Sequence, residues 1–168
     1  MQQPVIANKP ELTIVGLQRS FVHAQSPDAN NLQVLGRLWS EFLPPAGSVP
    51  HRVGHAMYGV IFERPPAERS HPHELEYIAG VAVNSTENLP AGMVAHMIPA
   101  AQFAVFLHRG PIQNIGATVG EVYRGWLPAS PYEHSRLADI ELYDERFCPD
   151  SGDSVMEYWI SIRPRAIR

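Results

Sequence analysis

The sequence predicts an α+β domain made of two pseudo-symmetric strand-helix-strand-strand modules. These modules are expected to form a curved antiparallel sheet with two helices on one face. Three observations predict this class. Two segments carry apolar residues at helical spacing and end at a proline, β-rich segments surround them, and the element order of the first half recurs in the second. The chain has 168 residues, 45% of them apolar, which suits one domain with a real core.

The first half opens with a β-rich segment at 12–23, which we expect to be a strand. Ser26 or Asp28 then stands where a helix cap is needed. Apolar residues recur at helical spacing after it, until Pro44-Pro45 ends the helix. Two further strands are expected at 56–63 and 75–83.

The second half repeats this order. Short strands are expected at 93–99 and 102–110, and Pro111 can start a helix because its missing N–H is not needed in a first turn. Pro128 is expected to end that helix. The last two strands are expected at 138–147 and 154–162.

The repeat divides a single domain, residues 1–168, into halves of about 11–90 and 91–163. Both closing strands carry a Glu-Tyr pair, Glu76-Tyr77 and Glu157-Tyr158. The middle strands are expected to match residue for residue, 59–63 with 141–145.

Composition excludes several kinds of protein. The formal net charge is −4 and no basic run is present, so a nucleic-acid-binding surface is not expected. Cys148 is the only cysteine, which excludes an intrachain disulfide and favours a cytoplasmic protein. No apolar run is long enough to span a membrane. Eight acidic residues against two arginines lie between Glu133 and Glu157, a local net charge of −6.

Six sequence segments together resemble a known family, the GyrI-like small-molecule-binding domain. They are YGVIFE, EYIAGVAV, IPAAQFAVFLHRGP, WLPASPY, DIELYDERF and EYWISI, and the resemblance extends over about residues 12–162. The same domain is the effector-binding module of AraC-type and MerR-type multidrug regulators. Those regulators carry a separate helix-turn-helix domain, whereas about eleven residues precede the first strand here. The resemblance therefore implies a stand-alone ligand-binding module without direct DNA binding.

Glu141 is the candidate with the sharpest physical argument. Strand geometry puts Glu141, Tyr143 and Glu145 on one face. A carboxylate in mid-strand is costly if buried without a partner, so it either meets solvent on the outer face or serves a site. The resemblance implies that Glu141 lies at the floor of an aromatic cleft. There it would attract a lipophilic cation, or act as a general acid or base.

Aromatic side chains are expected to line or flank that cleft. Their faces bind cations and stack on planar rings, although each is equally suited to a core. The candidates are Trp39 and Phe42 at the end of the first helix, Tyr123 and Trp126 at the end of the second, Tyr58 and Tyr143 on strands, and Tyr132 at the rim.

We therefore expect a module that binds amphipathic, cationic or planar aromatic small molecules. Two alternatives stay open: a hydrolase of electrophilic cyclopropane-containing compounds that uses Glu141, and a gyrase-inhibitor-like protein-interaction module. We expect no cofactor. We also expect no metal, because the pairs His51 with His55 and His71 with His73 lack a clear third ligand.

Overall fold

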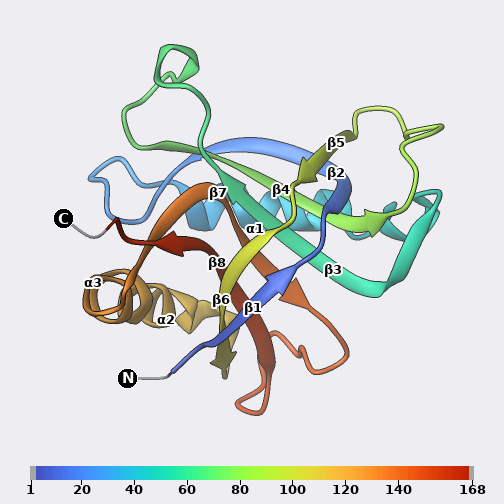
Figure 1. Cartoon of the computed structure of the whole chain (residues 1–168). Coiled ribbons are helices and arrows are strands. Elements are labelled where there is room, and N and C mark those ends of the chain that lie inside the picture. The colour runs from blue at the N-terminus through green and yellow to red at the C-terminus, as the bar shows by residue number, and fades with distance from the viewer. Residues whose placement is uncertain (1–2, 167–168) are drawn as a thin grey trace. The chain divides into compact units, whose positions relative to one another are not determined.

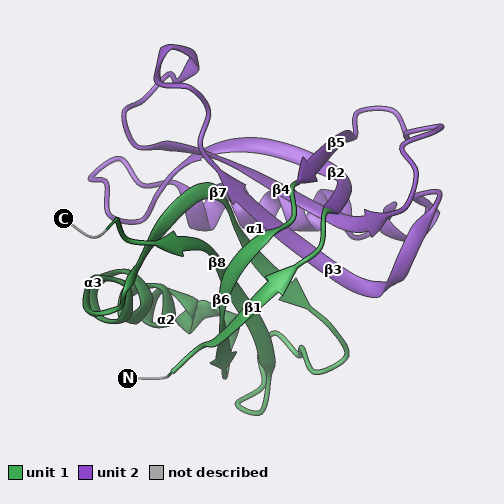
Figure 2. Ribbon diagram, in the orientation of Figure 1, with its two compact units in different colours: residues 1–11, 99–168 green, residues 12–98 purple. Residues whose placement is uncertain are grey.

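The computed structural model describes residues 3–166 (Figure 1). The chain divides into two compact units, one of residues 12–98 and one of residues 1–11 and 99–168 (Figure 2). Within the described residues, each unit has four strands paired in antiparallel fashion and a helix packed on them. This confirms the predicted α+β class.

The unit of residues 12–98 has the strand order β3-β4-β2-β5. Its elements are β2 (Leu12–Val22), α1 (Asn31–Phe42), β3 (Arg52–Phe62), β4 (Glu74–Val83) and β5 (Val94–Ile98). Helix α1 forms here because Leu38 and Phe42, four residues apart, lie on one face and pack against Val15 and Tyr77 of the sheet. All four are buried and form the core of this unit.

The predicted start of the first helix is wrong. Helix α1 begins at Asn31, and neither Ser26 nor Asp28 caps it. The hydroxyl of Ser26 instead accepts the backbone N–H of Asp28 at 3.3 Å, in a turn that precedes the helix. Serine and aspartate favour such local turns for the same reason that they favour caps, so the sequence cannot separate the two roles.

The other unit has the strand order β1-β6-β8-β7. Its elements are β1 (Val5–Lys9), β6 (Ala101–Arg109), α2 (Ile115–Glu121), α3 (Leu127–Ala129), β7 (Tyr132–Tyr143) and β8 (Val155–Pro164). The core lies between the helical segment and one face of the sheet, where Val122 and Trp126 pack on Phe106, Tyr158 and Ile160.

The helical segment of this unit is not uniform. A turn of π-helix, Val122–Trp126, lies between α2 and α3, and the N–H of Leu127 bonds to the carbonyl of Val122, five residues back. Pro128 has no N–H to donate, but the first turn of α3 tolerates it, so the helix ends at Ala129 and not at the expected Pro128. Among the described residues, no helix is long and apolar enough to cross a membrane.

Three strands differ clearly from the prediction, and one of them is β3, which begins at Arg52 and not at residue 56. Strand β1 was not expected, because five residues between Pro4 and Pro10 form only a short strand paired on one side. Strand β7 is longer at its start than predicted and ends at Tyr143. The N–H of Arg146 bonds to the Asp144 carboxylate at 3.0 Å in the turn that follows, so Glu145 is exposed and not on the strand face.

The strand register also corrects the predicted matching of 59–63 with 141–145. Tyr77 lies opposite Ile61, and Tyr158 lies opposite Glu141. If the tyrosines of the closing strands are matched, Glu141 corresponds to Ile61, two residues from the predicted partner.

Candidate functional site

Strand β7 carries a buried carboxylate at Glu141. The side chains of Glu141 and Tyr143 alternate onto one face of the strand, as the sequence predicts. Only 8% of Glu141 is exposed, and the Tyr143 hydroxyl donates to its Oε2 at 2.8 Å. The interpretation as a fully exposed strand glutamate therefore does not hold.

Strand β7 carries a second buried carboxylate, Asp139, which was not predicted from the sequence. It lies two residues before Glu141, on the same face of β7, and is 7% exposed. The hydroxyls of Tyr123 and Tyr158 both donate to its Oδ2, at 2.5 and 2.6 Å, and Nε2 of His134 donates to its Oδ1 at 2.9 Å. The period of two that selects Glu141 also selects Asp139, so the signal was present in the segment DIELY.

An irregularity of β7 positions His134 to donate to Asp139. The register with β8 breaks between His134 and Asp139, and Arg136 adopts a left-handed backbone with φ of 64°. Nδ1 of His134 accepts the backbone N–H of Arg136 at 3.1 Å, which leaves Nε2 as the nitrogen that carries the proton. The imidazole thus meets Asp139 as a neutral donor.

The phenol of Tyr158 stays protonated beside this carboxylate. Burial, and then the negative charge of Asp139, raises the pKa of Tyr158 well above its ordinary value. Its hydroxyl is therefore a permanent donor to Asp139 at neutral pH.

The π-helical turn contributes two aromatic side chains that pack near Asp139 and Tyr158. It carries Tyr123, which reaches Asp139, and Trp126, which is 7% exposed and meets Phe106 edge-on at 5.2 Å between ring centroids. Turns of this kind are frequent at functional sites, because the extra residue re-aims side chains that a regular helix would place elsewhere.

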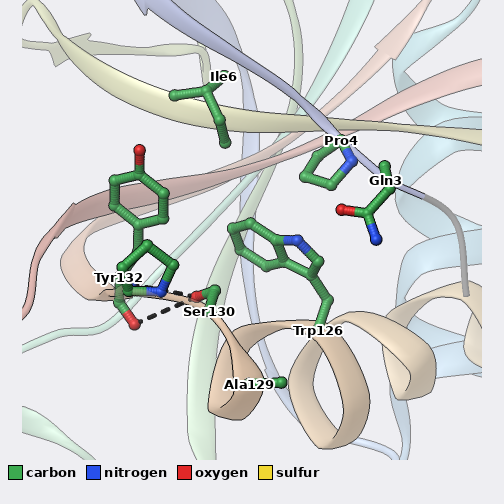
Figure 3. Close-up of a pocket in the computed structure, with 8 residues that line it drawn as sticks. Gln3, Pro4, Ile6, Trp126, Ala129, Ser130 and Tyr132 are labelled. Carbon is green, nitrogen blue, oxygen red and sulfur yellow. Dashed lines mark hydrogen bonds between the residues drawn. The ribbon is translucent and has the colours of Figure 1, made fainter.

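A groove of about 340 Å³ lies on the other side of Trp126 (Figure 3). The Trp126 and Tyr132 rings are nearly parallel, with centroids 6.2 Å apart, and the N-terminal strand runs above them. The residues that line the groove are Gln3, Pro4, Ile6, Trp126, Ala129, Ser130, Pro131 and Tyr132. Both aromatic candidates line it, but neither Glu141 nor Asp139 does.

Three aromatic candidates belong to the other unit. Phe42 is fully buried, which fits the core role that the sequence left open and leaves no surface for a ligand. Trp39 is partly exposed, packs on the same core and donates its indole N–H to the Tyr77 hydroxyl at 3.0 Å. Tyr58 lies in β3 and is partly exposed.

The rest of the acidic segment is surface. Arg146 donates to both Asp144 and Glu157, at distances of 2.6 to 3.0 Å. The hydrogen bonds from the Arg146 guanidinium hold the pKa of Asp144 below its usual value. Among the described residues, no group of three or more His, Cys, Asp or Glu side chains is arranged to hold a metal ion.

Comparison with known proteins shows the family of the chain. A family model described as the GyrI-like small molecule binding domain matches residues 2–163, which confirms the resemblance predicted from the sequence. The transcriptional regulator BrlR of Pseudomonas aeruginosa strain PAO1 is 27% identical over 159 residues. The match covers 94% of this chain and 54% of BrlR, so the chain spans about half of that regulator.

Solved structures share the fold. SAV2435 bound to tetraphenylphosphonium has a TM-score of 0.76 at 13% identity, covering 96% of this chain and 94% of that one. The EcmrR C-terminal domain has a TM-score of 0.67 at 14% identity, covering 97% and 98%. A hydrolase encoded by lin2189 from Listeria innocua has a TM-score of 0.53 at 9% identity, covering 96% and 92%. At these identities the likeness concerns the fold alone.

Proposed function

The chain belongs to the GyrI-like family of small-molecule-binding domains, and from this premise we propose that its ligands are amphipathic cations with aromatic rings. The observation that carries the proposal is the buried carboxylate of Glu141 on a strand face that also carries phenol side chains. A carboxylate removed from water gains most from a ligand that brings a positive charge and sheds its own hydration through apolar surface.

Two further findings support this choice of ligand. The solved structure of SAV2435, which shares the fold, is described as bound to tetraphenylphosphonium, a cation surrounded by aromatic rings. In this chain, Glu141 accepts a hydrogen bond from the Tyr143 hydroxyl, and the phenols of Tyr123 and Tyr158 donate to Asp139 on the same face. Aromatic faces attract cations and stack on planar rings, so they suit the same ligands as the carboxylate.

We extend the proposal to the biological role. A module of this kind reports a ligand to a transcription regulator, either as a part of one or as its partner in the cytoplasm, and does not contact DNA itself. The similarity to BrlR and the absence of any basic run support this.

The test is to replace Glu141 with Gln and to titrate ethidium, an aromatic monocation, by fluorescence. Glutamine keeps an oxygen that accepts the Tyr143 hydroxyl but has no charge, so we expect binding to weaken at least about tenfold with a nearly unchanged melting temperature. Glu145→Gln is the matched control, because it removes the same charge from an exposed turn. Equal ethidium affinity in wild type and Glu141→Gln would show that Glu141 is not the anchor.

A further inference from the structure

We infer that Asp139 is a specificity-determining residue of the same site: its buried charge selects ligands by their positive charge, without touching them. This rests on the proposed function, since it concerns how that site discriminates among ligands. Three observations carry it: the kind of partners that Asp139 has, its position beside Glu141, and the contrast with the other unit of the chain.

Asp139 is held by hydrogen bonds that do not neutralise it. Its donors are two phenols, Tyr123 and Tyr158, and the Nε2–H of His134. His134 is neutral, since its Nδ1 accepts a backbone N–H. In the part of the chain that the structure describes, no Lys or Arg forms an ion pair with Asp139. Three donors therefore contact the carboxylate, and none of them is a Lys or Arg whose positive charge would offset the charge of Asp139.

The position of Asp139 directs that charge to the site. Residues two apart in a strand share a face and lie about 6.6 Å apart along it. Asp139 and Glu141 are both buried, so little water screens one from the other's surroundings. Three donors already surround the Asp139 carboxylate. A ligand at Glu141 therefore feels the electrostatic field of Asp139 without contacting the atoms of Asp139.

In the other unit, the two strand positions that correspond to Asp139 and Glu141 carry no carboxylate. With Tyr77 matched to Tyr158, the register puts Gly59 where Asp139 stands and Ile61 where Glu141 stands. There the helix and the closing strand meet directly, through the hydrogen bond from the Trp39 indole to the Tyr77 hydroxyl. In the unit with Asp139, by contrast, the helix tyrosine Tyr123 and the closing-strand tyrosine Tyr158 both donate to the same carboxylate oxygen.

The experiment compares three ligands that share a ring system. Phenanthridine is neutral at pH 7, ethidium carries one positive charge, and propidium carries two. A charge about 7–10 Å away, at an effective dielectric constant of about 20–40, changes affinity roughly 4- to 50-fold. We expect Asp139→Asn to weaken ethidium by a factor in this range, to weaken propidium more, and to leave phenanthridine within about twofold. Titrations are run at low ionic strength, where screening is weakest.

Two variants make the result unambiguous. Glu133→Gln removes an exposed charge from the same strand, where Glu133 pairs with Arg163, and should change none of the three affinities. Glu141→Gln keeps Asp139, so it should retain a residual preference for ethidium over phenanthridine. This second measurement decides the matter even if Asp139→Asn fails to fold.

The outcomes separate the two proposals. If Glu141→Gln weakens ethidium but Asp139→Asn leaves the ethidium-to-phenanthridine ratio unchanged, Asp139 has no role in selection and the inference is wrong. Equal loss for all three ligands in Asp139→Asn would assign it a merely structural role, which also overturns the inference. If wild type binds no probe, or Glu141→Gln changes no affinity, the proposed function fails first and the inference with it.

Discussion

Replacing Tyr158 with Phe tests whether the buried Asp139 carboxylate depends on its phenol donors. Tyr158 is 2% exposed, and its hydroxyl donates to Asp139 at 2.6 Å. A hydrogen bond to a charged group contributes about 1.5–3 kcal/mol. Tyr123 and His134 remain as donors in the variant, so we expect the free energy of unfolding to fall by about 2 kcal/mol. For a chain of this size, that corresponds to a melting temperature about 4–8 °C lower.

The assay is urea denaturation followed by circular dichroism, with the slope of the transition as a check that the unfolded state is unchanged. Tyr132→Phe is the matched control, because the Tyr132 hydroxyl makes no hydrogen bond within the described part of the chain. We expect this control to change the free energy of unfolding by less than about 0.5 kcal/mol. If the two variants lose the same stability, the hydroxyl of Tyr158 does not stabilise Asp139 and the reasoning is refuted.

Two further predictions concern the unit of residues 12–98. His96 stacks on Phe62 with ring centroids 4.1 Å apart, and burial lowers the pKa of His96. Protonation therefore favours the unfolded chain, so the free energy of unfolding should fall as pH drops below about 6.5. His96→Phe should flatten this pH dependence in thermal melts, and an unchanged pH profile would contradict the prediction. A Cβ at Gly16 would collide with the Ala79 carbonyl, so Gly16→Ala should lower the free energy of unfolding by at least about 3 kcal/mol in the same denaturation assay. Gly36 lies on α1 in open space, so Gly36→Ala should raise the free energy of unfolding by up to about 1 kcal/mol. Equal effects of the two substitutions would refute the close approach at Gly16.

Much of the fold could be predicted because it depends on local pattern. The helical spacing of Leu35, Trp39 and Phe42 indicates which side of the first helix faces the core, and the alternation in DIELY indicates which residues share a face of β7. The helix start and the strand β1 could not be predicted. A serine or aspartate serves turn and cap alike, and a five-residue strand is stable only through its pairing with β6.

Part of the candidate site could also be predicted from the sequence, and part could not. The sequence predicted the carboxylate of Glu141 beside Tyr143, and the structure buries it there. It also grouped Phe42 with the possible ligand contacts, whereas the structure buries Phe42 completely. Helical spacing shows that a side chain faces inward, but only the packing of the neighbouring strands determines whether any surface remains.

By itself, the sequence determined the fold class, the family and the face of β7 that carries Glu141, because periodicity and motif order are properties of the chain. Only the tertiary structure decided that Asp139 accepts hydrogen bonds from three side chains. Its donors Tyr123, His134 and Tyr158 come from a π-helical turn, from the irregular start of β7 and from the partner strand β8. No local pattern encodes their meeting, since hydrogen bonds between elements depend on strand register and on an extra residue in a helical turn.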